Sequence, residues 1–270
     1  VLARTVANAD GEEVREYPYD ETFVHVVGRF LQSRTGIELS ENFTMLTSRI
    51  SELDKVLLQL EGEKLPGDSV VTTLNADLQT AAYEALGDRR GAVVAIEPST
   101  GKILAMVSKP DYDPNTVAEN WEALITDEEE ESALLNRALN GLYPPGSTFK
   151  LATTLAYIRE HPGDYEEYSY TCEGQGRFHQ VTIHCAGNTA HGLVDLRSSF
   201  ARSCNTSFVN IGTGISVRTL MDVCTGLLYH TTLPGALSVT SSSFVLTEES
   251  DENEIPQTVI GLGKTQITPM

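Results

Sequence analysis

Two places in the chain combine a serine with a lysine three residues later, a spacing that suits nucleophilic catalysis. One pair is Ser99 and Lys102 in EPSTGKILAM, and the other is Ser147 and Lys150 in GLYPPGSTFKLATT. A serine hydroxyl is a weak nucleophile until a neighbouring base removes its proton. A lysine amine can act as that base when burial disfavours its charged form. At most one of the two pairs is expected to be catalytic.

The first pair lies in a predicted turn. Residues 91–108 consist of two short apolar runs separated by the sequence PSTG, which is a strong pattern for a β-hairpin. In such a turn no helical register brings the tips of Ser99 and Lys102 together. We therefore interpret this pair as turn residues.

The second pair begins a predicted helix. The sequence PPG before Ser147 cannot form the interior of a helix, so it is expected to be a rigid lead-in. From Ser147 onward, STFKLATTLAYIRE has the periodicity of an amphipathic helix, which places Lys150 about one turn later on the same face. The helix N-terminus also offers unpaired N–H groups to a developing oxyanion. The pattern favours Ser147 as nucleophile and Lys150 as base; the alternative is a capping serine followed by a surface lysine.

A Ser-x-Asn sequence follows the predicted nucleophile. Ser203 and Asn205 lie in FARSCNTSFVNIG, after HGLVDLRSSFA, which we predict to be a short helix. Ser203 would then lie at the end of that helix, able to enter a cleft. A second Ser-x-Asn, at Ser40 and Asn42, precedes the nucleophile and lies in the N-terminal part of the chain. It is therefore left out of the candidate site.

The four cysteines allow more than one interpretation. Cys172 and Cys185 enclose a hairpin-like stretch that contains two histidines, so a zinc site is conceivable from the residue types. The spacing fits no common zinc pattern, and we predict no metal site. A disulfide between these two residues is plausible outside the cytoplasm. Cys204 and Cys224 are expected to be small buried side chains.

The composition indicates a folded chain of one or two domains. The chain has 270 residues, of which 40% are hydrophobic, so it can bury a sizeable core. Its net charge of −19 argues against a nucleic-acid partner, because phosphate binding needs clustered basic residues. Acidic runs at 127–131 and 248–254 are expected to be solvated loops.

The elements that would position the site have a mixed α and β pattern. The N-terminal part predicts a turn at Asp10-Gly11, a strand in FVHVVGRF and an amphipathic helix in SRISELDKVLLQLEG, followed by a linker at LPGDS. The sequence after residue 70 predicts a helix capped by Asn75 or Asp77 and ended by Gly87. With the 91–108 hairpin, this pattern independently favours the α+β class.

A serine–lysine pair followed by Ser-x-Asn resembles the penicillin-recognising serine enzymes. The chain is similar, over nearly its whole length, to the class B penicillin-binding proteins, which are monofunctional peptidoglycan D,D-transpeptidases. The segments that carry this resemblance are TTLNADLQTAAYEAL, RGAVVAIEPSTGKILAMVSKPDYDPN, LLNRALNGLYPPGSTFKL, HGLVDL and FARSCNTSF.

The resemblance implies a role for each site residue. Ser147 would attack the carbonyl of a D-alanyl-D-alanine stem peptide and form an acyl-enzyme, with Lys150 as the base. Ser203 would relay a proton toward the leaving group, and Asn205 would hold the substrate amide and orient Lys150. An amine of a neighbouring peptidoglycan strand would then resolve the acyl-enzyme. A β-lactam would trap Ser147 as a covalent adduct.

The resemblance also implies a fold, a location and partners. It predicts an α+β transpeptidase (serine β-lactamase-like) fold with a five-stranded antiparallel sheet flanked by helices. Residues 1–69 would be a small elongated pedestal or dimerisation-like module, and 70–270 the transpeptidase domain. The protein would face the outside of a bacterial membrane through an N-terminal anchor not contained in this chain. Expected partners are peptidoglycan stem peptides, β-lactams and a membrane glycosyltransferase; no cofactor, metal or nucleic acid is expected.

The chain departs from the family pattern at its third motif. The family carries Lys-Thr-Gly or a close variant on a strand beside the cleft, whereas the chain has Lys264, Thr265 and Gln266 inside GLGKTQITPM. This segment resembles the block that precedes the third motif. The motif itself is expected beyond Met270, and the chain alone is expected to acylate weakly or not at all. Two alternatives to a transpeptidase remain: a β-lactam sensor or β-lactamase-like protein, and an inactive scaffold of the wall-building complex.

Overall fold

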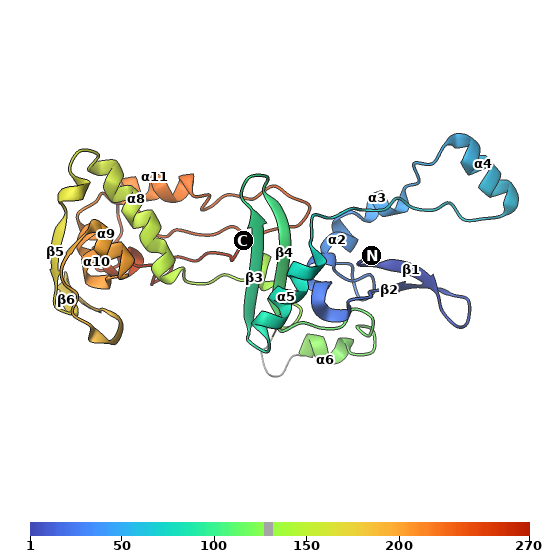
Figure 1. Cartoon of the computed structure of the whole chain (residues 1–270), viewed down its shortest axis with the longest axis horizontal. Helices are drawn as coiled ribbons and strands as arrows, with labels where there is room; N and C mark the ends of the chain where they lie inside the picture. Colours follow the sequence, from blue (N-terminus) through green and yellow to red (C-terminus); the bar gives the residue numbers. More distant parts are fainter. Residues whose placement is uncertain (127–131) are drawn as a thin grey trace. The chain divides into compact units, whose positions relative to one another are not determined.

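The computed structural model describes residues 1–126 and 132–270, and these form two compact units (Figure 1). Unit 1 contains Val1–Gly141, Pro234–Val239 and Pro269–Met270, and unit 2 contains Leu142–Leu233 and Thr240–Thr268. The sequence predicts a boundary between an N-terminal module and the transpeptidase domain at residue 69. Neither unit begins or ends there, since the units are groups of residues in mutual contact, and the boundary stays a prediction. The acidic run at 127–131 lies outside the described residues. The run at 248–254 is a mostly exposed loop, as expected.

Unit 1 begins with a β-hairpin. Strands β1 (Arg4–Ala7) and β2 (Glu13–Glu16) pair in antiparallel fashion with Val6 opposite Val14. Gly11, in the loop between them, has a φ of 79°, a left-handed conformation that glycine adopts without strain. The predicted turn at Asp10-Gly11 is therefore confirmed.

The predicted strand in FVHVVGRF is wrong. The segment forms a 3-10 turn η1 (Asp20–Phe23) and a helical turn α1 (Val24–Val27), and all four residues of α1 are buried. A half-exposed strand would turn alternate side chains toward solvent, whereas burial on all sides gives no such alternation. Gly28 ends the turn with a φ of 90°, where a Cβ atom would lie 1.8 Å from the Thr35 carbonyl oxygen.

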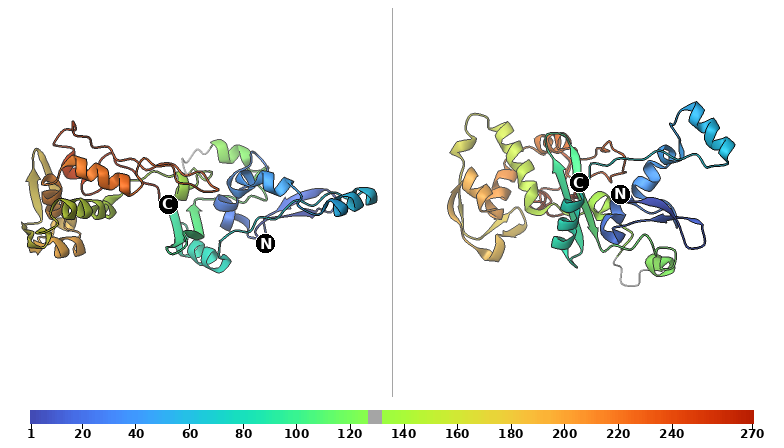
Figure 2. Two further views of the ribbon diagram at one scale, coloured as in Figure 1. Left: turned by 90° about the horizontal axis from the view of Figure 1, so that it is seen from above. Right: turned by 45° about the vertical axis from the view of Figure 1, so that its right-hand side comes forward.

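The predicted amphipathic helix of the N-terminal part is confirmed as α4 (Glu52–Glu61), after the short helices α2 (Gly36–Ser40) and α3 (Asn42–Leu46). The Ser51 side chain caps α4 by accepting a hydrogen bond from Asp54 N, and Gly62 ends it in a left-handed conformation. The apolar face of α4 is exposed, and the helix lies away from the rest of unit 1 in the right-hand view of Figure 2.

The 91–108 hairpin is also confirmed. Strands β3 (Gly91–Glu97) and β4 (Lys102–Lys109) pair with each other, and helix α5 (Ala76–Leu86) lies beside them (Figure 1). The Asn75 side chain caps α5, and Gln79 fixes the helix to β4 through hydrogen bonds with Met106 N at 2.7 Å and Met106 O at 2.8 Å. In the described residues the sheet has these two strands, so the five strands implied by the resemblance are not present there.

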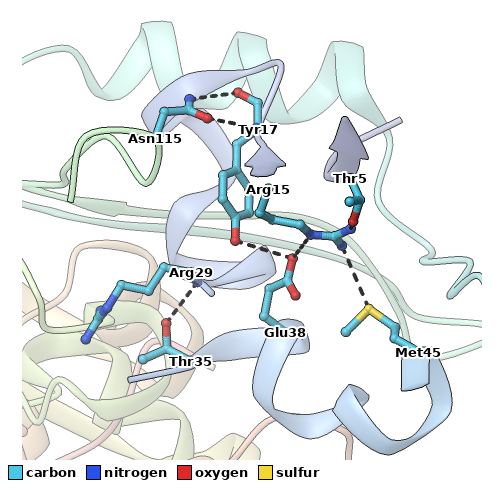
Figure 3. Close-up of polar contacts among 8 residues, drawn as sticks. All are labelled: Thr5, Arg15, Tyr17, Arg29, Thr35, Glu38, Met45 and Asn115. Atoms are coloured by element: carbon cyan, nitrogen blue, oxygen red, sulfur yellow. Dashed lines mark hydrogen bonds and ion pairs between the residues drawn. The ribbon is translucent and has the colours of Figure 1, made fainter. Parts of the chain in front are cut away.

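A partly buried ion pair joins β2 and α2 in unit 1. Arg15 Nε donates to Glu38 Oε1 at 2.7 Å, and the Glu38 side chain is only 4% exposed (Figure 3). The Tyr17 hydroxyl donates to the same carboxylate at 3.4 Å. Nη1 and Nη2 of Arg15 contact Thr5 and Met45, so the guanidinium is held on several sides. Beyond this network, α6 (Trp121–Thr126) and α7 (Arg137–Asn140) complete the helices of unit 1.

Unit 2 surrounds one apolar core with short elements. The chain enters through η2 (Gly146–Phe149) and α8 (Lys150–Glu160), passes η3 (Tyr165–Glu167), and forms two antiparallel pairs, β5 (Ser169–Cys172) with β8 (Gly192–Asp195) and β6 (Gln175–Phe178) with β7 (Val181–His184). The turn η4 (Ala186–Asn188) precedes β8. The remaining helices are α9 (Leu196–Ala201), α10 (Asn205–Thr213), α11 (Val217–Gly226) and α12 (Ile255–Thr258).

The predicted helix in HGLVDLRSSFA is only half correct. Residues Gly192–Asp195 form strand β8, and the helix α9 begins at Leu196. Asp195 starts α9 through a capping box with Ser198, in which each side chain bonds the other residue's backbone N–H. The side chains of Phe149, Phe208 and Val259 lie in the core that α8, α10 and α12 share. Within the described residues, no helix has the length and apolar character needed to cross a bilayer.

Candidate active site

Ser147 and Lys150 lie where the predicted lead-in becomes a helix. Ser147 is part of the 3-10 turn η2, and Lys150 is the first residue of α8, so the two side chains are one turn apart. Gly146, with a φ of 56°, donates its N–H to the Gly261 carbonyl at 2.8 Å. A Cβ atom on Gly261 would lie 1.9 Å from the Gly146 carbonyl oxygen. The two backbone segments can therefore come this close only because residue 261 is a glycine.

Ser203 and Asn205 come from the junction between α9 and α10. Ser203 has a φ of 51°, a left-handed conformation that is uncommon for a residue with a side chain. Its N–H donates to Phe200 O at 3.0 Å, and the N–H of Cys204 donates to Ser199 O at 2.9 Å. Asn205 then begins α10, with Cys204 as the N-cap residue. The tight turn between the helices therefore fixes the direction of both polar side chains.

These four predicted residues are brought together around the Lys150 amine. Lys150 Nζ lies 3.2 Å from Ser147 Oγ, 2.9 Å from Ser203 Oγ and 2.6 Å from Asn205 Oδ1, and it also donates to Ser203 O at 2.8 Å. The Ser203 hydroxyl donates to Ser147 Oγ at 3.0 Å. The nucleophile candidate thus has both an amine and a second hydroxyl within hydrogen-bond distance. Ser99 lies in the β3–β4 turn, as expected, whereas Lys102 is the first residue of strand β4.

Burial and uncharged partners tune the Lys150 amine. The side chain is 2% exposed, and its hydrogen-bond partners are hydroxyl, carbonyl and amide oxygens. Burial lowers the pKa of Lys150 to about 8, against the opposing influence of the Cys204 and Cys185 thiols. A lysine with this pKa has a substantial neutral fraction near neutral pH, and a neutral amine can accept the serine proton.

A backbone carbonyl at the end of strand β7 fixes the side chain of Asn205. Its Nδ2 donates to the His184 carbonyl oxygen at 2.9 Å, which leaves Oδ1 to accept from Lys150. His184 is the last residue of β7, so the strand pair holds the amide that contacts the amine. This support was not evident from the sequence, because it depends on a backbone atom of a distant strand.

The cysteines form a cluster that differs from the sequence interpretation. Cys172 and Cys185 lie close to Cys204 and His191, with all four ligand-type atoms within 4.8 Å of one another. The two histidines of the intervening stretch are elsewhere: His179 pairs with Glu252, and His184 Nδ1 contacts Asn188.

The pKa values of the buried thiols shift in different directions. All four cysteines are free thiols. Burial opposes ionisation of Cys172, but hydrogen bonds from Thr206 and other donors outweigh it and lower its pKa to about 6. Burial raises the pKa of Cys224, which lies apart in the apolar core, to about 12. The expectation of a small buried side chain holds for Cys224 and Cys204, but Cys204 also contacts other thiols.

A serine hydroxyl beside a buried amine and a second hydroxyl defines a class of site, that of the serine acyl-transfer enzymes. The family description "Penicillin binding protein transpeptidase domain" matches residues 91–270, which include all four site residues. The chain therefore belongs to the penicillin-binding protein transpeptidase family, and its α+β transpeptidase fold is that of the family.

Relatives agree in sequence and in structure. The peptidoglycan D,D-transpeptidase PbpA of Mycolicibacterium smegmatis is 37% identical over 218 residues, which is 74% of this chain and 44% of the relative. Penicillin-binding protein A of M. tuberculosis, solved as its penicillin G acyl-enzyme, has a TM-score of 0.86 at 31% identity and covers 100% of this chain. A D,D-transpeptidase domain from Eggerthella lenta has a TM-score of 0.84 at 28% identity over 99% of this chain.

The chain spans part of the length of these relatives. It covers 44% of the M. smegmatis protein, 66% of the M. tuberculosis structure and 64% of the E. lenta structure. The named M. tuberculosis protein forms covalent acyl-enzymes with imipenem and penicillin G.

Proposed function

We propose that the protein containing this chain cross-links peptidoglycan by acyl transfer through Ser147. The observation that carries the proposal is the set of contacts around Lys150 Nζ, 3.2 Å from Ser147 Oγ and 2.9 Å from Ser203 Oγ. Membership of a family whose relatives are named D,D-transpeptidases supplies the reaction class. The substrate would be a D-alanyl-D-alanine stem peptide, and a β-lactam would act as its covalent mimic.

In this mechanism the neutral Lys150 amine accepts the proton as Ser147 Oγ attacks the carbonyl carbon. The Ser203 hydroxyl, which bonds both Ser147 Oγ and Lys150 Nζ, can return the proton to the departing amine. The C–N bond breaks, D-alanine leaves, and the acyl group stays on Ser147. An acceptor amine on a neighbouring strand then attacks the ester and passes its proton to Lys150 or Ser203. That proton is delivered to Ser147 Oγ as the C–O bond breaks, which releases the cross-linked product and restores the serine hydroxyl.

Asn205 has two roles in this proposal. Its Oδ1 accepts from Lys150 at 2.6 Å, so it keeps the amine directed at the serines. Its position at the start of α10 also leaves it beside the reacting group, where it would bind the substrate amide. We propose that a protein with these roles would work on the outer face of a bacterial membrane, together with a glycosyltransferase that makes the strands. Residues 1–69 would serve as its pedestal module.

The test is the intact mass of the protein, at its full natural length, before and after reaction with penicillin G. We expect one penicilloyl adduct that persists for hours, and none in Ser147→Ala. Ser99→Ala is the matched control, because it removes the hydroxyl of the other Ser-x-x-Lys pair, and it should acylate normally. An adduct that disappears within minutes would instead indicate a β-lactamase. The absence of any adduct on the wild-type protein would contradict the proposal and favour a scaffold.

A further inference from the structure

The segment GLGKTQITPM, which follows α12, runs beside the lead-in to the nucleophile. Gly146, the residue before Ser147, donates its N–H to the Gly261 carbonyl oxygen at 2.8 Å. Tyr143 and Ile267 exchange two backbone hydrogen bonds, at 2.9 and 2.8 Å, as residues of an antiparallel strand pair do. The segment therefore holds the lead-in at two points, one of which directly adjoins the nucleophile.

The side chains of the Lys-Thr-Gln sequence in this segment are engaged elsewhere. Lys264 Nζ pairs with Glu254 Oε1 at 3.0 Å, and the lysine side chain is 78% exposed. Thr265 is 0% exposed, so its hydroxyl cannot reach a bound substrate. The hydrogen bonds that join the segment to the lead-in are made by backbone atoms. Its backbone is therefore what can act on the site.

A buried threonine of α8 fixes the start of the same segment. Thr153 Oγ1 donates to the Val259 carbonyl oxygen at 2.7 Å, and both residues are 0% exposed. A Cβ atom on Gly212 of α10 would lie 2.5 Å from Val259 Cβ, so α10 packs directly against this residue. A buried carbonyl that loses its donor has no water to replace it, which makes this hydrogen bond costly to break.

We propose that residues 259–267 form a backbone clamp that sets the distance between Ser147 and Lys150. Thr153 is the positioning residue that fixes this clamp to α8, three residues after Lys150 on the same helix. At its other contact, the clamp holds the turn that carries Ser147 through the carbonyl oxygen of Gly261. The clamp thus connects the element that carries the base with the element that carries the nucleophile.

The distance that the clamp controls is the one most easily lost. Ser147 Oγ lies 3.2 Å from Lys150 Nζ, which is the longest of the four contacts of that amine. A hydrogen bond of this length is broken by a small displacement, and a misplacement of about 1 Å can lower a rate about 10²-fold. The effect of the clamp on acylation rests on the proposed function, whereas the clamp itself does not.

The positioning role is tested with Thr153→Val in the protein at its full natural length. Valine keeps the shape of threonine but lacks the donor, so the Val259 carbonyl loses its partner. We expect penicillin G to acylate Ser147 about 10–100-fold more slowly, followed by intact mass over time at several concentrations. Thr153→Ser keeps the hydroxyl and should restore most of the rate. Thr213→Val is the matched control, because Thr213 Oγ1 bonds only carbonyl oxygens of its own helix in the part of the chain that the structure describes, and it should react like wild type.

The yield of adduct separates positioning from folding. A variant with less folded protein gives less final adduct, whereas a misplaced serine gives the full amount more slowly. The dependence on penicillin concentration separates a slower acylation step from weaker prior binding. A Thr153→Val variant that reacts at the wild-type rate, or that loses only yield or prior binding, would overturn the positioning role. So would a Thr153→Ser variant as slow as Thr153→Val, because the methyl group and not the hydroxyl would then be decisive.

The clamp itself is tested by hydrogen exchange of the Gly146 amide, which requires no reaction and stays decisive if the proposed function fails. In the wild-type protein this amide and that of Tyr143 should exchange far more slowly than the amide of Glu252 in the exposed loop. Thr153→Val should speed exchange at Gly146, and Thr213→Val should not. Unchanged exchange in Thr153→Val would overturn the link through Thr153. Wild-type exchange at Gly146 as fast as at Glu252 would overturn the clamp, even if Thr153→Val does not fold.

Discussion

Each unit of the molecule holds a long basic side chain against buried groups, and the two side chains have different partners; Arg15 is partly buried and Lys150 fully buried. In unit 1, Arg15 Nε lies 2.7 Å from the carboxylate of Glu38, and Thr5 and Met45 contact the rest of its guanidinium. In unit 2, Lys150 is bonded to the uncharged oxygens of Ser147, Ser203 and Asn205. A buried cation with a carboxylate keeps its proton, whereas a buried amine without one gives it up more readily.

The comparison separates a structural role from a chemical one. A guanidinium stays protonated in proteins, so Arg15 can serve only as a fixed charge and hydrogen-bond donor. The Lys150 amine has a pKa lowered to about 8 by burial, which allows it to exchange a proton with a neighbouring hydroxyl. The difference therefore predicts that losing Lys150 affects reaction rate, whereas losing Arg15 affects stability.

The largest expected effect is that of Lys150→Met on acylation. Removal of the base should lower the second-order rate constant for acylation by penicillin G about 10²–10⁴-fold, measured by intact mass over time. Lys150→Arg should be equally slow, because it keeps a charge but cannot accept a proton. Thermal unfolding of both variants provides the control for folding. A Lys150→Arg variant with near wild-type rate would show that charge alone is required.

The next effect is that of Arg15→Met on unfolding. The substitution leaves the Glu38 carboxylate, which is 4% exposed, without its ionic partner. Breaking a buried pair in this way costs about 3 kcal/mol of the free energy of unfolding, and Glu38→Leu added to it should recover most of the loss. Urea unfolding followed by the fluorescence of Trp121, which lies in unit 1, measures both. Equal losses in the single and double variants would mean that packing, not charge, dominates.

The smallest effect is expected for Lys264→Met. Lys264 Nζ lies 3.0 Å from Glu254 Oε1, but its side chain is 78% exposed. An exposed pair of this kind contributes about 0–1 kcal/mol, so urea unfolding should hardly change, and acylation should stay at the wild-type rate. A loss of unfolding free energy as large as that of Arg15→Met would contradict the argument that burial decides how much an ion pair stabilises the fold.

The sequence predicts local features of the fold well. The lead-in before Ser147, the helix after it and the β3–β4 hairpin depend on proline, glycine and apolar spacing within a few residues, and the structure contains all three. The helix predicted from Ser147 begins as the 3-10 turn η2 and becomes the α-helix α8 at Lys150. The prediction for FVHVVGRF fails because its burial comes from other segments of unit 1. Apolar residues that are buried on every side have no periodicity to distinguish a helical turn from a strand.

The sequence also predicts the grouping of the site residues, but not its supports. Ser147, Lys150, Ser203 and Asn205 form recognisable short patterns, and the structure brings them within hydrogen-bond distance of one amine. The cysteine cluster has no such pattern, because strand pairing and the start of α10 bring its members together. The available signal was Cys204, because it places a thiol between Ser203 and Asn205 in the sequence.

The central claim is that Lys150 reacts as a neutral amine, and the pH dependence of acylation tests it most directly. The second-order rate constant for penicillin G, followed by intact mass from pH 6 to 9.5, reports the pKa of the free enzyme. With the pKa of Lys150 at about 8, the amine is mostly protonated at the lower end. The rate should therefore rise about tenfold per pH unit below that value and level off above it. A rate that is constant or falls across this range would contradict the account.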